Sequence, residues 1–213
     1  MSLGILGGTF NPVHLAHLRV AEEVRETLGL ESVLFVPAGD PPHKRARIAP
    51  FEQRLEMLEI ATAANPAFEV SDLEGRREGR SYTLHTLREL GALHPDRRLW
   101  FIIGSDAFEL LDSWHRPEEL FALASFAVVG RPGTARRRLE ARLPTTLASQ
   151  FQPTPLGLEH RSGQEIREVD VTPLAVSASD LRRRVARGAS LRYLVPDAVI
   201  DYIQKHGLYR EET

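Results

Sequence analysis

The stretch Gly7-Gly8-Thr9-Phe10-Asn11-Pro12-Val13-His14-Leu15-Ala16-His17 decides the fold class of this chain. It follows a short apolar run, residues 3–6, which predicts a β-strand, and it leads into a helical pattern over residues 14–28. A glycine turn between a strand and a helix start directs backbone N–H groups at an anion, so the arrangement is typical of a phosphate site. The glycine spacing matches neither GxGxxG nor GxxxxGK(S/T), which excludes an ordinary dinucleotide-binding motif and a P-loop.

Apolar runs and helical patterns alternate along the rest of the chain, which predicts an α/β fold. We expect a Rossmann-like, doubly wound parallel sheet with helices on both faces and a helical C-terminal region. Further strands are predicted at residues 32–36, 68–70, 99–103, 126–129 and 166–171, with 99–103 central in the sheet and 166–171 at an edge. Further helices are predicted at residues 51–64, 81–93, 179–186 and 196–205. The less regular segment 134–165 predicts a surface helix with loops.

The composition narrows the class of protein. The chain has 213 residues, with 27 basic and 29 acidic side chains. This length predicts a single domain, residues 1–213, with the helices from residue 177 onwards packed on it. The charge balance argues against nucleic acid and against a membrane surface as partners. No run reaches the ~18 apolar residues of a membrane span, and no signal peptide is evident. The absence of cysteine excludes disulfides and thiolate metal sites and fits the cytoplasm.

The histidines of the opening stretch are the first candidates for chemistry. His14 and His17 lie three residues apart, so a helix places them on one face. Such a pair also suits a metal ion, but no third ligand stands out nearby. After Gly8 and Thr9 the pair is better suited to donate hydrogen bonds to phosphate oxygens, aided by about half a unit of positive charge at the helix start.

Further polar residues follow the other predicted strands, where an open parallel sheet binds its ligands. Lys44 follows two prolines in a stiff loop and suits polyphosphate charge; a solvated lysine in a rigid turn is the alternative. Asp106, after Gly104, could accept hydrogen bonds from ribose hydroxyls. Trp114 offers a stacking face for a planar ring, or seals an edge of the core.

Late in the chain, a predicted helix start offers a second anion site. Ser177 or Ser179 is expected to cap this helix, and Arg182 on its first turn reaches the same anion. Two further expectations concern residues nearer the N-terminus. Ser81 is expected to cap the helix at residues 81–93. Arg131, which follows a predicted strand, is expected to be a weaker phosphate ligand.

Five blocks of this sequence occur in the order known from one family: GGTFNPVHLAH, PPHK, SYT, GSDAF with the later Trp114, and VSASDLR. They resemble the bacterial nicotinate-nucleotide adenylyltransferases of the (T/H)xGH nucleotidyltransferase superfamily. The resemblance extends to Leu208-Tyr209 and so covers nearly the whole chain. Two positions depart from the family pattern: Ala16 replaces the usual glycine between the histidines, and Ala178 replaces a hydroxyl residue.

The resemblance implies adenylyl transfer from ATP to nicotinate mononucleotide in NAD biosynthesis. It implies Mg²⁺ carried mainly by ATP and no dedicated protein metal site, and it allows a homodimer. The expected catalytic residues are His14, His17, Lys44 and Arg182. The expected ATP contacts are these histidines and Arg182 together with Gly8, Thr9, Phe10, Gly104, Asp106, Arg131 and Ser177. The expected contacts with the second substrate are Asp40, Lys44, Thr83 and Trp114, with Thr83 near the pyridine carboxylate and Trp114 stacked on the ring.

Three other functions are alternatives to this one. Nicotinamide mononucleotide differs from the nicotinate form only by an amide, so activity on it, or on both, stays open. The SYT block and Trp114 argue against phosphopantetheine as the acceptor. A nucleotide-binding protein without turnover is disfavoured because His14, His17, Lys44 and Arg182 are all present.

Overall fold

The computed structural model describes residues 1–40, 48–130 and 139–210. These residues form two compact units. Unit 1 comprises residues 1–6, 20–33 and 82–172, and unit 2 comprises residues 7–19, 34–81 and 173–213. The first two strands and the first long helix each begin in one unit and end in the other.

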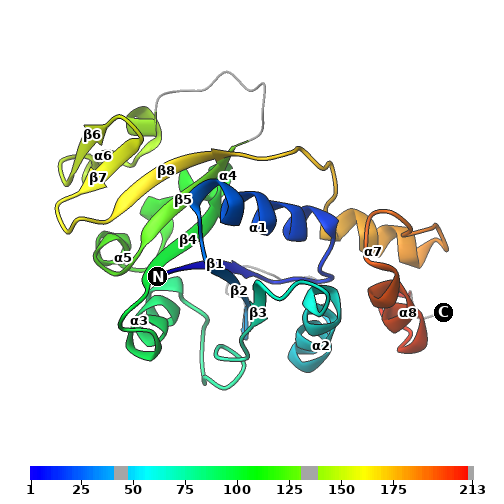
Figure 1. Ribbon diagram of the computed structural model, residues 1–213. Helices are drawn as coiled ribbons and strands as arrows, with labels where there is room; N and C mark the ends of the chain where they lie inside the picture. The colour runs from blue at the N-terminus through cyan, green and yellow to red at the C-terminus, as the bar shows by residue number, and fades with distance from the viewer. Residues whose placement is uncertain (41–47, 131–138, 211–213) are drawn as a thin grey trace. The chain divides into compact units, whose positions relative to one another are not determined.

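The secondary structure, shown in Figure 1, follows the predicted alternation of strands and helices. The strands are β1 (Ser2–Gly8), β2 (Ser32–Pro37), β3 (Phe68–Val70), β4 (Arg98–Gly104), β5 (Ser125–Gly130), β6 (Phe151–Thr154), β7 (Gly157–His160) and β8 (Glu165–Asp170). The α-helices are α1 (Leu15–Leu28), α2 (Phe51–Thr62), α3 (Thr83–Leu93), α4 (Ser105–Phe108), α5 (Pro117–Leu123), α6 (Thr145–Ala148), α7 (Ala178–Ala186) and α8 (Asp197–Lys205). Two short 3₁₀ helices are η1 (Leu111–Ser113) and η2 (Leu139–Arg142).

The strands form one eight-stranded sheet in the order β3-β2-β1-β4-β5-β8-β7-β6. The pairs β1–β4, β4–β5 and β5–β8 are parallel, whereas β6–β7 and β7–β8 are antiparallel. The predicted α/β, Rossmann-like class is therefore confirmed, with β4 inside the sheet as expected. The strand order reverses at β1, the strand that ends in the glycine turn, and open α/β sheets bind ligands where the order reverses.

Two predictions about the second half of the chain are wrong. The strand expected at the edge, β8, lies inside the sheet between β5 and β7, and β6 is the edge strand. Part of the segment expected to form a surface helix with loops instead forms the hairpin β6–β7. Each of these strands has only four residues, too few to show a clear periodicity in the sequence. Pro153 within β6 fits an edge position because proline cannot donate a ladder hydrogen bond.

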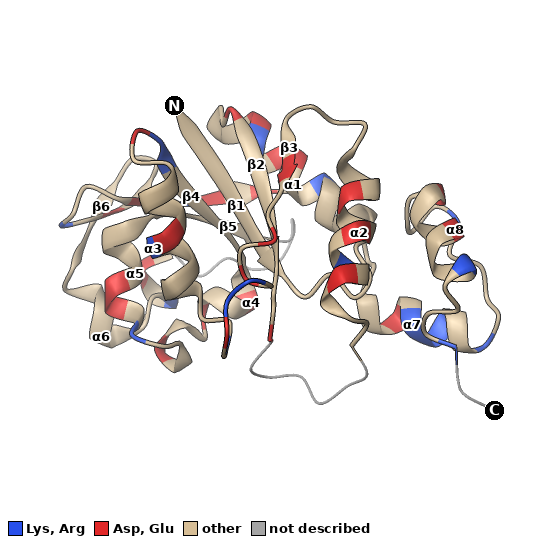
Figure 2. Cartoon of the chain, turned by 90° about the horizontal axis from the view of Figure 1, so that it is seen from below, with Lys and Arg blue, Asp and Glu red and all other residues tan. Residues whose placement is uncertain are grey.

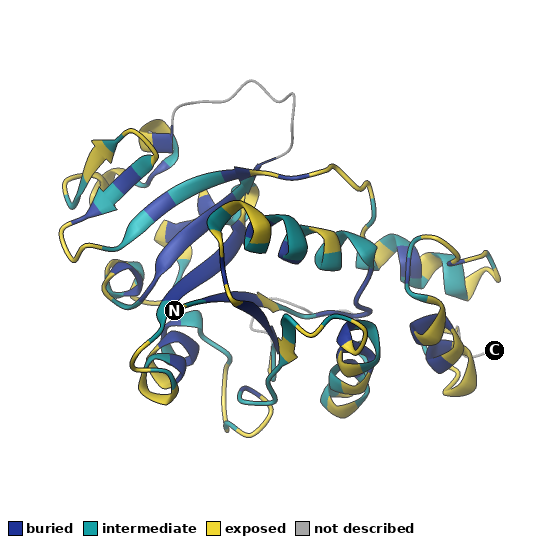
Figure 3. Cartoon of the chain, viewed as in Figure 1, coloured by how far each residue is buried: buried dark blue, intermediate teal, exposed yellow. Residues whose placement is uncertain are grey.

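The core of unit 1 is built on β4 and β5, which are buried along almost their whole length (Figure 3). Phe101 of β4 contacts Phe126 of β5, with ring centroids 5.5 Å apart. Phe126 in turn contacts Phe121 of α5, and α5 packs against α3. These contacts pack β4 into the core up to its carboxyl end, where Gly104 directly precedes α4.

Unit 2 contains α2, β3, α7 and α8, and α2 packs against both β3 and α8. Tyr202 of α8 donates a hydrogen bond to Glu56 of α2 at 2.6 Å, which ties the two helices together. Helix α7 carries acidic and basic residues close together, Asp180 in its first turn and the run Arg182 to Arg184 after that turn (Figure 2). Asp180 pairs with Arg183 and Arg184, whereas Arg182 turns to another partner.

Candidate active site

The glycine turn at the end of β1 is held by close packing within unit 2. The carbonyl of Gly8 accepts a hydrogen bond from the N–H of Ala38 at 2.8 Å, which fixes the end of β1 next to the end of β2. A Cβ at Gly8 would lie 3.0 Å from the ring of Phe10, so the turn leaves little room for any other residue. Phe10 has a left-handed φ of 47°, and its buried ring contacts Phe35 and His17. The ring is occupied by packing, so Phe10 has its backbone to offer a ligand.

The two histidines lie against each other at the start of α1. Their rings stack with centroids 3.7 Å apart, and the N–H of His14 donates to Nδ1 of His17 at 3.2 Å. Because Nδ1 of His17 accepts this bond, a neutral His17 ring carries its proton on Nε2, from which it can donate. Burial lowers the pKa of His14 from 6.5 to about 4, so this ring is neutral at pH 7. Its buried Nδ1 has no hydrogen-bond partner among the described residues. The pair is thus a cluster of ring N–H groups suited to an incoming anion.

Arg182 reaches the same segment from α7. Its Nη1 donates to the carbonyl of Asn11 at 2.7 Å, and its Nη2 donates to Oγ of Ser179 at 3.3 Å. Ser177 caps α7, since its Oγ accepts a hydrogen bond from the N–H of Asp180 at 3.2 Å, as expected for one of the two candidate serines. The structure therefore brings Arg182 of the last motif next to the histidine segment, inside one compact unit.

Arg54 is a positioning residue that the sequence analysis missed. It is 1% exposed and is among the largest fully buried side chains of the described residues. Its guanidinium donates to the carbonyls of Thr9 at 2.9 Å, Ala38 at 2.8 Å and Ala49 at 3.0 Å. Arg54 thus holds the glycine turn together with segments on both sides of residues 41–47. The helical spacing of Arg54 with Met57 and Leu58 places the arginine on the buried face of α2. Composition alone predicts an exposed arginine, because arginine side chains are seldom buried.

Ser81 does not cap α3, contrary to the prediction. Tyr82 occupies the N-cap position and makes no capping hydrogen bond with its side chain. Ser81 Oγ instead accepts hydrogen bonds from the N–H groups of Gly39 at 3.0 Å and Asp40 at 3.2 Å. These two N–H groups lie beyond the end of β2, and they donate to the hydroxyl oxygen of Ser81 in place of a strand partner. Ser81 therefore stabilises the turn that exposes Asp40.

In unit 1, an aromatic contact joins the segments of the two predicted pyridine-binding residues. Thr83 is the first residue of α3, and Trp114 follows η1 with its ring edge-to-face on Phe101, at 6.1 Å and 82°. Trp114 is only partly buried, so it both seals the core and exposes ring surface. The neighbouring residues Tyr82 and His115 stack on each other with centroids 4.5 Å apart. The sequence analysis missed this stack, which links the start of α3 to the Trp114 segment.

The two other predicted residues of unit 1 lie at the carboxyl end of β4. Gly104 precedes α4, and a Cβ built on it meets no atom within 4 Å. Asp106 is exposed on the first turn of α4. The other end of α4 is held by Arg142, which donates to Glu109 at 3.0 Å and to Glu168 of β8 at 2.6 Å. The space beside Gly104 is therefore open, and the neighbouring helix α4 is held in place by the bonds of Arg142.

Lys44 and Arg131 lie outside the described residues. Within the described ranges there is no group of three or more His, Cys, Asp or Glu side chains arranged to hold a metal ion. Within the same ranges, no helix is long and apolar enough to cross a membrane.

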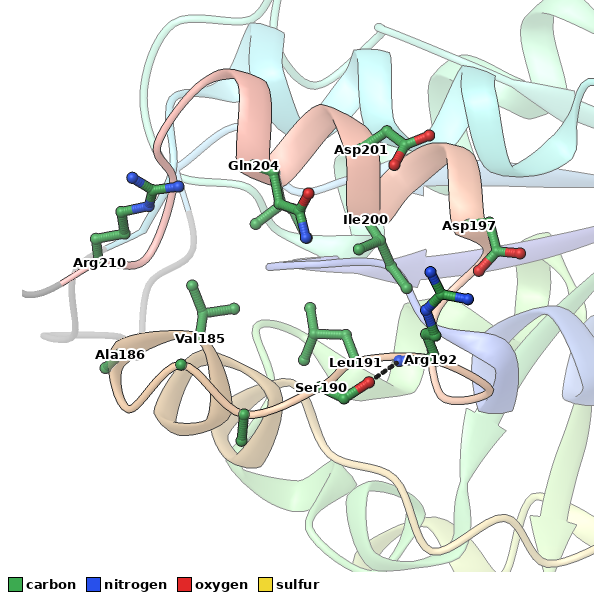
Figure 4. Close-up of a pocket in the computed structure, with 13 residues that line it drawn as sticks. Val185, Ala186, Ser190, Leu191, Arg192, Asp197, Ile200, Asp201, Gln204 and Arg210 are labelled. Atoms are coloured by element: carbon green, nitrogen blue, oxygen red, sulfur yellow. Dashed lines mark hydrogen bonds between the residues drawn. The ribbon is translucent and has the colours of Figure 1, made fainter.

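A cavity of about 700 Å³ lies apart from these residues, between α7 and α8 in unit 2 (Figure 4). Its walls combine apolar side chains such as Leu191 and Ile200 with Asp197, Asp201 and Arg192. None of the predicted site residues that the structure describes lines it.

Comparison with known proteins shows the family and the fold of this chain. Residues 5–184 match the family model described as cytidylyltransferase-like. A protein of Geobacter metallireducens named "probable nicotinate-nucleotide adenylyltransferase" is 48% identical, and the match covers all of both chains. A protein of Trichlorobacter lovleyi with the same name is 51% identical over 99% of this chain and 100% of the relative. The fold matches that of Plasmodium falciparum nicotinic acid mononucleotide adenylyltransferase complexed with NaAD, with a TM-score of 0.75, 20% identity and coverage of 98% and 97%.

Proposed function

Because the chain belongs to the cytidylyltransferase-like family, and within it to the nicotinate-nucleotide adenylyltransferases, we propose that it transfers the adenylyl group of ATP to nicotinate mononucleotide. The products are deamido-NAD and pyrophosphate, and the reaction belongs to NAD biosynthesis. One structural observation carries the proposal: the stacked pair His14 and His17 directly follows the glycine turn of β1. The chain matches its named relatives over its whole length, which extends the argument beyond this motif.

The reaction is a displacement at phosphorus. A phosphate oxygen of nicotinate mononucleotide attacks the α-phosphorus of ATP and forms a new P–O bond, while the bond to the bridging oxygen of the β-phosphate breaks and pyrophosphate leaves. The attacking phosphate is already ionised at neutral pH, so no strong general base is needed. Catalysis then depends on aligning the two phosphates and on stabilising the charge that develops at the α-phosphorus.

In this scheme one set of residues binds the phosphates of ATP. His14 and His17 donate ring N–H groups to phosphate oxygens, and the backbone of Gly8, Thr9 and Phe10 adds further donors. Arg182 supplies positive charge; a guanidinium carries five N–H groups, of which two make the bonds to Asn11 and Ser179. Lys44 and, more weakly, Arg131 are proposed to add charge, and Ser177 to contribute through the start of α7.

A second set of residues is proposed to recognise the nucleoside portions of the substrates. We assign ring stacking to Trp114 and a hydrogen bond near the pyridine carboxylate to Thr83, which the Tyr82–His115 stack supports. Gly104 and Asp106 contact the nucleotide backbone and ribose. Asp40 of unit 2, exposed at the turn held by Ser81, contacts the mononucleotide.

Mg²⁺ is proposed to bind together with ATP. Mg²⁺ held by phosphate oxygens and water needs few protein ligands, and the protein ligands it prefers are carboxylate oxygens. When bound, the ion neutralises phosphate charge. Among the predicted site residues, the exposed carboxylates of Asp40 and Asp106 would supply oxygen ligands.

We further propose a cellular location and a domain organisation for the enzyme. A cytoplasmic location is supported by the absence of cysteine and by the bacterial origin of the relatives. A single functional domain is supported by β1, β2 and α1, each of which contributes residues to both units. A homodimer stays a prediction.

Pyrophosphate release with ATP and Mg²⁺ tests the function directly. Nicotinate mononucleotide, nicotinamide mononucleotide and phosphopantetheine are compared at matched concentrations. A strong preference for the nicotinate form is expected. Comparable rates with both pyridine nucleotides would make the enzyme dual-specific, and no release with any acceptor, despite ATP binding, would favour a protein without turnover.

A further inference from the structure

Asn11 is the point at which three segments distant in sequence meet inside unit 2. Its side-chain Oδ1 accepts hydrogen bonds from the N–H of Ala49 at 3.1 Å and from the hydroxyl of Tyr209 at 2.8 Å. Its carbonyl accepts the bond from Arg182 at 2.7 Å. Asn11 is 2% exposed and lies three residues before His14. Whatever fixes Asn11 therefore also fixes the segment that carries both histidines.

Tyr209 reaches Asn11 from near the C-terminus of the chain. Its backbone has a φ of 62°, in the left-handed region that a residue with a Cβ seldom adopts, so tertiary contacts must stabilise this conformation. Burial raises the pKa of the Tyr209 hydroxyl well above its usual range, which keeps the donated proton in place at neutral pH. The hydroxyl of the half-buried Tyr209 is therefore a reliable donor to the buried amide oxygen of Asn11.

We propose that Tyr209 is a positioning residue: by fixing Asn11, it holds the phosphate-binding segment and Arg182 in the geometry that binds the triphosphate of ATP. The inference rests on the proposed function, because it takes residues 8–17 as the phosphate site. Tyr209 acts through Asn11 and does not itself contact the nucleotide. Losing its hydroxyl relaxes the turn before His14 and weakens ATP binding.

The chain offers matched controls for a purely structural role. Tyr202 also lies in unit 2, is buried, and donates its hydroxyl to Glu56 at 2.6 Å, on α2 and not on the phosphate-binding segment. Tyr202→Phe and Tyr209→Phe therefore each remove one hydroxyl and one hydrogen bond from the same unit. Arg210, the next residue after Tyr209, lines the cavity between α7 and α8 (Figure 4). Arg210→Ala thus controls for changes in the end of the chain.

The experiment measures ATP binding separately from turnover. Calorimetric titration with ATP and Mg²⁺, without an acceptor, is expected to show about fivefold to tenfold weaker binding in Tyr209→Phe, the scale of one lost hydrogen bond. Steady-state kinetics are expected to show the same increase in KM for ATP and less than a twofold change in KM for nicotinate mononucleotide. Tyr202→Phe and Arg210→Ala are expected to stay within twofold of the wild type in both measurements.

Three outcomes distinguish failure of this inference from failure of the proposed function. If Tyr209→Phe binds ATP as the wild type does, at a temperature where all variants are folded, the positioning role is overturned. An equal loss of affinity in Tyr202→Phe would likewise overturn it, since the effect would then be a general consequence of lost stability. If the wild type binds ATP but transfers no adenylyl group, the proposed function fails, while the titrations still decide the role of Tyr209.

Discussion

Replacing Arg54 by methionine tests whether a buried cation organises the phosphate-binding segment. Methionine fills a similar volume without a cavity, so the substitution removes the guanidinium rather than the packing. The side chain is 1% exposed, and burial lowers the pKa of Arg54, which reflects the cost of placing a cation there. That cost is offset by hydrogen bonds to the carbonyls of Thr9, Ala38 and Ala49.

The expected destabilisation follows from these three bonds. Each carbonyl left without a donor lowers the free energy of unfolding by ~1–3 kcal/mol. Removing a buried cation is itself stabilising and offsets part of this loss. The net loss in the free energy of unfolding is then about 4 kcal/mol. For a chain of this size, that loss lowers Tm by about 8–16 °C. Arg54→Lys keeps the charge but lacks the fork that reaches three carbonyls, so about half of the loss is expected.

Guanidinium chloride unfolding, followed by circular dichroism, measures these differences. Arg76→Met is the matched control, because Arg76 lies in the same unit, with its side chain 78% exposed, in an ion pair with Asp72. This control is expected to stay within about 0.5 kcal/mol of the wild type. The reasoning is refuted if Arg54→Met lies within 1 kcal/mol of Arg76→Met.

Further predictions concern single residues of the two units. His17→Ala is expected to lower kcat by about 10²–10³-fold with little change in Tm, because a donor to the developing charge is lost; near-normal turnover would contradict the phosphate role. Trp114→Ala is expected to raise KM for nicotinate mononucleotide by about three- to tenfold and to spare KM for ATP. His115→Ala is expected to have a smaller effect in the same direction, which His115→Phe reverses because it keeps the stack on Tyr82. The pKa of His14, about 4 in the folded chain, means that only the unfolded chain binds the proton between pH 6.5 and 4. The free energy of unfolding therefore decreases as the pH is lowered through this window, by about 2 kcal/mol at pH 5. Urea unfolding of His14→Gln at pH 7 and pH 5 is expected to lack this decrease.

The parallel part of the fold could be predicted from the sequence because its signals are local. Buried strands such as β4 are continuous apolar runs, and every predicted strand and helix begins and ends within two residues of the observed element. The hairpin β6–β7 could not be predicted in this way. Its strands are short, and it is stabilised by contacts distant in sequence, such as the ring of Phe151 against Phe121 of α5. Without that hairpin, β8 looks like an edge strand.

The predicted site residues are those with a recognisable motif, and the missed residues are those that hold them. His14, Arg182 and Ser177 lie in glycine- or serine-containing patterns with a known chemical reason. Arg54 carries no such pattern, and the opening motif does not show what the side chain of Asn11 binds, because the partners of both residues belong to segments distant in the chain. Pairing across such distances leaves no periodicity in the sequence, so only the folded structure identifies these residues.

The bond from Arg54 to Thr9 also bears on catalysis directly. Residues 9–14 have no regular secondary structure, so their backbone polar groups need partners outside a helix or strand. The peptide between Thr9 and Phe10 is trans and planar; when its carbonyl points to Arg54, the N–H of Phe10 points the opposite way. Arg54 therefore sets the direction of a donor assigned to the ATP phosphates, without contacting them. If this is correct, Arg54→Met loses ATP affinity even at temperatures where it is fully folded, whereas a purely structural Arg54 would leave the affinity of the folded fraction unchanged.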